Sequence, residues 1–106
     1  MFFGRKPSIT AEQAAAALAK RELMLIVVRW PAEVRSGRVR GAVNIPLGQL
    51  RDRLHELDSE RQLAFLCHSG ARSSRATSIA LKAGYDAVNV RGGTIAWARA
   101  GLPLSR

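Results

Sequence analysis

Two short, almost wholly apolar runs constrain the fold of this chain most strongly. Residues 23–28 read Leu-Met-Leu-Ile-Val-Val, and residues 63–67 read Leu-Ala-Phe-Leu-Cys. A strand with one solvated face alternates apolar and polar residues, whereas a strand buried on both faces is apolar throughout. The runs therefore predict central strands of a parallel sheet.

Helical patterns lie between the apolar runs. Thr10 and Gln13 have the spacing of a capping box in front of an alanine-rich segment. Leucines recur at helical spacing from residue 47 to residue 57. This alternation predicts an α/β protein whose parallel sheet carries helices on both faces. The expected strands are residues 8–9, 23–28, 42–45, 63–67 and 87–90, and the expected helices are residues 11–20, 47–57, 73–83 and a last one that carries Trp97 as a core anchor.

Length and hydropathy predict one domain. The 106 residues fit a single unit, with residues 1–7 as an N-terminal tail and residues 8–106 as the domain. No apolar run approaches the roughly 18 residues of a membrane span. The first residues are not expected to form a signal peptide, because two phenylalanines and a charge are far short of its apolar stretch. The expected location is the cytoplasm, with no membrane partner.

The formal net charge of +9 attracts anions. The basic residues are spread along the chain and few aromatic residues lie among them, which disfavours nucleic acid as a partner. A basic surface that keeps the protein soluble and a small anionic substrate are the remaining interpretations.

Cys67 is the only cysteine, so the chain cannot form an internal disulfide or a multi-cysteine metal site. It ends a predicted strand, and a helix is expected to begin at Ser73 or Ser74 after a short loop. Gly70 lets that loop curl and turn its N–H groups toward the sulfur. The helix terminus and Arg72 add positive potential. The pattern predicts a thiolate nucleophile that handles a small anion, to which Arg72 can fork two N–H bonds. Residue chemistry leaves sulfur transfer and phosphate-ester cleavage both open.

Three motifs in order resemble those of the rhodanese family. Cys67-His68-Ser69-Gly70-Ala71-Arg72-Ser73 resembles its active-site loop of Cys, four residues, Arg and then Ser or Thr. Residues 37–47 resemble its Gly-His-Ile-x-Gly-Ala-x-Asn-Ile-Pro segment, and residues 90–97 resemble its Gly-Gly-x-x-x-Trp ending. The related cysteine phosphatases carry five residues between Cys and Arg, so the shorter loop favours sulfur transfer.

The resemblance implies a five-stranded parallel sheet and a sulfurtransferase that needs no cofactor. With two histidines, one cysteine and no clustered carboxylates, no metal site is expected either. Cys67 would take a sulfane sulfur from thiosulfate or another persulfide donor and pass it to a thiol or cyanide. A thioredoxin-like or sulfur-carrier protein is a further possible acceptor. The alternative is a relay module that docks a sulfur-trafficking protein. The substrate-binding residues implied are His68, Ser69, Gly70, Ala71, Arg72 and Ser73. The loop N–H groups would hold the anionic sulfur, and Arg72 would hold the loop and help position the donor. His68, Ser69 and Ala71 would shape the mouth of the site and tune the donor preference.

Two positions depart from the family pattern. Val27 stands where the family usually has Asp, and Arg38 stands where it usually has His. The missing carboxylate would leave Arg29 without its expected partner, a place that Glu33 can take. Gaining Arg38 would make the site more attractive to anions, so that thiosulfate affinity rises as salt is lowered.

Overall fold

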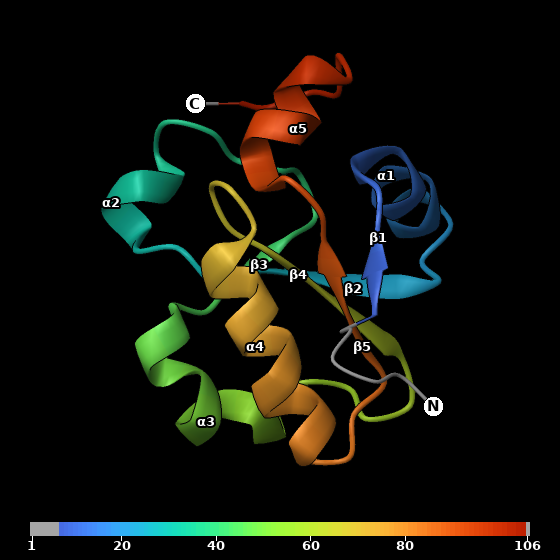
Figure 1. Cartoon of the computed structure of the whole chain (residues 1–106), viewed down its shortest axis with the longest axis vertical. Coiled ribbons are helices and arrows are strands. Elements are labelled where there is room, and N and C mark those ends of the chain that lie inside the picture. The colour runs from blue at the N-terminus through green and yellow to red at the C-terminus, as the bar shows by residue number, and fades with distance from the viewer. Residues whose placement is uncertain (1–6, 106) are drawn as a thin grey trace.

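Five parallel strands form one sheet in the order β1-β5-β4-β2-β3, which confirms the predicted fold (Figure 1). This computed structural model describes residues 7–105, so the expected tail lies outside the described residues except for Pro7. The strands are β1 (Ser8–Ile9), β2 (Leu23–Val27), β3 (Val43–Asn44), β4 (Gln62–Leu66) and β5 (Ala87–Val90); the α-helices are α1 (Ala11–Ala19), α2 (Pro31–Val34), α3 (Leu50–Arg53), α4 (Ala71–Lys82) and α5 (Gly93–Arg99).

The central strands are buried on both faces, which explains their continuous apolar sequence. Side chains of successive strand residues point to opposite faces, so Ile26 and Phe65 enter one core while Leu25 and Leu66 enter the other. α3 and α4 pack on the first core, and α1 and α5 pack on the second. Within residues 7–105 no helix is long and apolar enough to cross a membrane.

Two predictions about the helices are confirmed, the start of α1 and the role of Trp97 in α5. At the start of α1 the Gln13 N–H donates to Thr10 Oγ1 at 3.1 Å and the Thr10 N–H donates to Gln13 Oε1 at 2.9 Å, which completes the capping box. In α5 the Trp97 side chain is only 2% exposed, and its indole N–H donates to the Pro103 carbonyl at 3.1 Å. Trp97 is therefore a core anchor, as predicted.

The continuous helix predicted over residues 47–57 is wrong. The segment consists of a 3₁₀ turn at Leu47–Gln49, the single α-turn α3 and a second 3₁₀ turn at Leu54–Glu56. Gly48 is a poor helix former, and the φ of −114° at Arg53 departs from helical values. The leucine spacing still buries Leu50, Leu54 and Leu57, because three-residue and four-residue turns both return side chains to the same face.

Candidate active site

Cys67 follows β4 directly, at the carboxyl edge of the sheet. α4 begins at Ala71, so the prediction that it begins at Ser73 or Ser74 is wrong. Gly70 is the N-cap and has a φ of 111°, a conformation that reverses the chain at once and suits glycine. The segment that we call the Cys67 loop is therefore only residues 67–70. Ala71 and Arg72 lie in the first turn of α4.

Hydrogen-bond donors surround the Cys67 sulfur. The Gly70 N–H donates to Sγ at 3.0 Å, and the Ser73 hydroxyl oxygen lies 3.3 Å from Sγ. Burial by itself raises the pKa of the Cys67 thiol. Hydrogen bonds from the Ser73 side chain and from the backbone N–H groups of Ser73, Gly70 and Ser69 outweigh that effect, so this pKa lies below its ordinary value. The loop therefore favours the nucleophilic thiolate.

The Ser73 hydroxyl has more acceptors than protons. Besides the sulfur, its oxygen lies 2.6 Å from Asn89 Oδ1 and 3.2 Å from the Gly70 carbonyl. One O–H group donates to one of these acceptors at a time. When Cys67 is a thiolate the proton can turn to the sulfur. When Cys67 is a thiol, its S–H can donate to Ser73 and the Ser73 proton can turn to Asn89. Sequence reasoning missed Asn89, although an asparagine inside the apolar strand β5 is a signal for it.

The start of α5 orients the Cys67 loop from behind. The Thr94 N–H donates to the Cys67 carbonyl at 2.9 Å, and the Ile95 N–H donates to the His68 carbonyl at 3.2 Å. A Cβ at Gly93 would lie 2.4 Å from the His68 carbonyl oxygen, so only glycine allows this approach. Figure 1 shows the yellow loop before α4 beside the start of α5. The Cys67 and His68 carbonyls thus point toward α5, while the Gly70 N–H points toward the Cys67 sulfur.

Arg72 does not face the sulfur with its guanidinium fork. Its Nη1 and Nη2 donate to the two carboxylate oxygens of Glu33 at 2.7 and 2.9 Å. The prediction that Arg72 forks to an oxyanion differs from this arrangement, because both Nη atoms are already bonded to the Glu33 carboxylate. The bond therefore holds the first turn of α4 to α2.

Glu33 is the acidic centre of this edge of the sheet. The Arg72 hydrogen bond and the Trp30 N–H lower the pKa of Glu33 to about 2. Glu33 also takes the predicted place beside Arg29, at 3.7 Å from its Nε, although this atom forms no hydrogen bond with residues 7–105. Arg72 is thus its stronger partner. The Glu33 carboxylate thus contacts Arg29, which follows β2, and Arg72, which lies in the helix after β4.

The mouth of the Cys67 loop consists of exposed residues. His68, Ser69 and Ala71 are exposed, whereas Cys67 is only 1% exposed. The His68 Nδ1 lies 3.4 Å from the Thr94 hydroxyl. The buried Cys67 is therefore followed by exposed residues, His68 and Ser69 next to it and Ala71 at the start of α4.

Val27 lies on the other face of the sheet from Cys67. It packs in the core under α1 and α5, whereas Cys67 packs in the core under α3 and α4. With Arg38 it lines a separate cavity of about 590 Å³. The Asn44 side chain supports this edge by donating to the carbonyls of Val27 and Arg29, both at 2.8 Å. Val27 and Arg38, the two positions that depart from the family pattern, therefore line a cavity that contains no residue of the Cys67 loop.

A parallel α/β domain with a cysteine in an amide-lined loop at its carboxyl edge defines a class of cysteine-dependent proteins. The model of the Rhodanese-like domain matches residues 10–100, and the chain belongs to this family. A sulfurtransferase of Allochromatium vinosum is 40% identical over 98 residues, which cover 91% of this chain and 92% of that protein.

Solved structures agree with this assignment. A rhodanese-related protein of Thermoplasma volcanium superposes with a TM-score of 0.86 at 28% identity and covers 92% of this chain and 96% of its own. A thiosulfate sulfurtransferase of Pseudomonas aeruginosa superposes with a TM-score of 0.86 at 30% identity over 95% of this chain and 20% of its own. These relatives support a rhodanese-type enzyme and sulfur transfer as its general chemistry.

Proposed function

We propose that the protein moves a sulfane sulfur from thiosulfate or another persulfide donor to a thiol or cyanide through a persulfide on Cys67. The observation that carries this proposal is the Gly70 N–H at 3.0 Å from the Cys67 sulfur, in a loop whose hydrogen bonds lower the pKa of the thiol. The same N–H groups suit the terminal sulfur of an anionic persulfide. The expected place of action is the cytoplasm.

The reaction has two displacements. The Cys67 thiolate attacks the sulfane sulfur of thiosulfate, an S–S bond forms to Cys67, and the S–S bond of thiosulfate breaks so that sulfite leaves with the electron pair. The acceptor thiolate or cyanide then attacks the terminal sulfur, and the Cys67 thiolate leaves. Because Cys67 is only 1% exposed, we expect it to react best with a donor that presents a single projecting sulfur atom.

Mass spectrometry tests this proposal directly. After incubation with thiosulfate we expect the intact chain to gain the mass of one sulfur atom, and cyanide should remove it with release of thiocyanate. Cys67→Ser should gain nothing, and this variant is a matched control because Cys67 is the only cysteine. A chain that gains no sulfur from thiosulfate or from a persulfide donor would contradict the proposal.

The exposed side chain of Trp30 is the observation that favours the relay alternative. The Trp30 side chain is 55% exposed, and its ring lies beside Gly48. Gly48 lines a cavity of about 400 Å³ with Leu47, Arg51, Asp52, Arg75 and Ile79. Exposed tryptophan and arginine are typical of protein interfaces. Under this alternative Trp30→Ala should slow transfer to a protein acceptor and leave transfer to cyanide unchanged. A variant that transfers sulfur to the protein acceptor as fast as the parent chain does would contradict it.

A further inference from the structure

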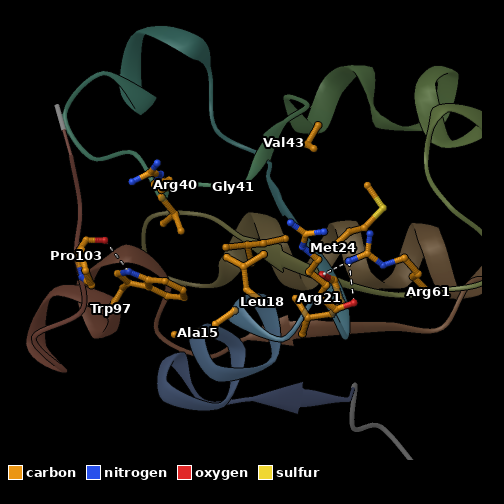
Figure 2. Close-up of a pocket in the computed structure, with 14 residues that line it drawn as sticks. Ala15, Leu18, Arg21, Met24, Arg40, Gly41, Val43, Arg61, Trp97 and Pro103 are labelled. Carbon is orange, nitrogen blue, oxygen red and sulfur yellow. Dashed lines mark hydrogen bonds between the residues drawn. The ribbon is translucent and has the colours of Figure 1, made fainter.

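A groove on the second face of the sheet is independent of Cys67. It lies between α1 and the segment that leads into β3, has a volume of about 610 Å³ and contains no residue of the Cys67 loop in its lining. We call it the α1–β3 groove (Figure 2). It forms because β3 pairs only with Ile26 and Val27, so the first half of β2 has no strand partner on that side among residues 7–105.

The lining of the α1–β3 groove is apolar except for three arginines. Leu18, Val43 and Trp97 are among its apolar residues. Arg21, Arg40 and Arg61 are the charged residues in its lining, which holds no Asp or Glu from the described part of the chain. Figure 2 shows Arg40 near one end and Arg21 with Arg61 near the other. An apolar wall with cations at its ends complements an anion that carries an apolar body.

The backbone at Arg21 is an independent sign of a role for its side chain. Arg21 follows α1 with a φ of 59°, and the Glu22 N–H donates to the Ala17 carbonyl at 2.9 Å. This is the Schellman position, at which glycine is favoured and other residues are strained. The chain nevertheless places an arginine there, and its side chain lines the groove.

Arg61 binds backbone carbonyls of the turn at Arg21 and forms no ion pair within residues 7–105. Its Nη2 donates to the carbonyls of Arg21 and Leu23 at 3.1 and 2.9 Å, while its buried Nε has no hydrogen-bond partner within residues 7–105. In that part of the chain no ion pair involves Arg21, Arg40 or Arg61. Two uncompensated guanidinium groups therefore lie at one end of an apolar groove.

We propose that the α1–β3 groove binds a small amphiphilic carboxylate, with the hydrocarbon body over Leu18 and Val43 and the carboxylate at Arg21 and Arg61. The carboxylate supplies the anionic acceptor that the two guanidinium groups lack. The apolar body covers the open side of β2. This site goes beyond sulfur transfer and does not depend on it.

Tryptophan fluorescence tests the site with decanoate kept below its micelle concentration. In a Trp30→Phe background the signal comes from Trp97, which lines the groove. We expect a saturable change with decanoate, a much weaker one with decanol and none with acetate. Equal binding of decanol, or binding only to anionic vesicles, would overturn the proposal.

Arg21→Gly separates binding from folding. Glycine relieves the positive φ, so we expect a higher melting temperature together with roughly tenfold or greater loss of decanoate affinity. Arg99→Gln, outside the groove on α5, is the matched charge control and should bind as the parent does. Unchanged affinity in Arg21→Gly would overturn the proposal. Cys67→Ser should still bind decanoate, so failure here is distinct from failure of the proposed sulfur transfer.

Discussion

The Cys67 loop and the α1–β3 groove are built from different parts of the chain. At the loop, backbone N–H groups of residues 69 and 70 point at the sulfur and the N–H groups of α5 hold the carbonyls. At the groove, side chains supply both the apolar wall and the charges. A backbone-built site tolerates side-chain changes at its mouth but not at its glycines. A site built from side chains has the opposite tolerance.

The largest effect should follow from adding one carbon atom behind the Cys67 loop. In Gly93→Ala the new Cβ would meet the His68 carbonyl oxygen at 2.4 Å, and the φ of 58° is also unfavourable for alanine. We expect a loss of at least about 3 kcal/mol in the free energy of unfolding. Thiocyanate production should fall even in the protein that remains folded, because the loop N–H groups are displaced.

Gly84→Ala is the matched control for this clash. Gly84 has a φ of 93°, and a Cβ there would meet nothing within 4 Å. The variant should lose only about 1 kcal/mol from backbone strain, with unchanged sulfur transfer. Urea unfolding and a thiocyanate assay on both variants measure the difference. Equal losses of stability would show that close backbone approach does not shape the loop.

Ser73 is the residue of the active site whose side chain, and not only its backbone, lowers the pKa of Cys67. Ser73→Ala removes the hydroxyl 3.3 Å from Sγ and should raise the pKa of Cys67, because a hydrogen bond that favours the thiolate is lost. At neutral pH the persulfide should form roughly tenfold more slowly, and the rate profile should shift to higher pH. Thiolate ultraviolet absorbance and single-turnover rates measure both changes.

A control for Ser73 lies one turn further along α4. The Thr77 hydroxyl donates to the Ser73 carbonyl at 2.8 Å and does not contact the sulfur. Thr77→Val replaces a buried hydroxyl with a methyl group of similar size and should leave the pH dependence of the rate unchanged. If Ser73→Ala also left it in place, the backbone N–H groups alone would set the pKa of Cys67.

Local patterns explain how much of the fold was predictable. The apolar run of β4 ends at Cys67, and Gly70 follows three residues later, so the strand, the loop and the kind of nucleophile could be predicted together. The exact start of α4 could not, because it depends on the φ of 111° that Gly70 adopts in the folded chain. The broken helix over residues 47–57 also escaped, since leucine spacing fits both kinds of turn.

Long-range pairing explains what the sequence left open at the site. Arg72 and Glu33 are separated by 39 positions, and the chain offers 17 basic residues for 8 acidic ones. No local rule selects one pair from that set. Asn89 likewise reaches Ser73 across 16 positions. Only the order of the strands brings these side chains to one edge.

The smallest effect concerns Glu33, which supports the Cys67 loop through side chains and not through the backbone. Its pKa of about 2 in the folded protein lies below the ordinary 4.5. The stability that this carboxylate contributes is therefore complete above about pH 4.5 and is lost as the pH falls toward 2. Glu33→Gln should be less stable at neutral pH and should lose less stability on acidification than the parent chain.

Unfolding by urea at a series of pH values tests this dependence. Glu22→Gln is the control, because Glu22 is exposed and forms no ion pair within residues 7–105. Its stability should follow that of the parent chain through the acid range. If Glu33→Gln and the parent lost stability in parallel below pH 4.5, the carboxylate would not hold α2 to α4. Backbone hydrogen bonds alone would then hold the Cys67 loop, whereas side chains form the α1–β3 groove.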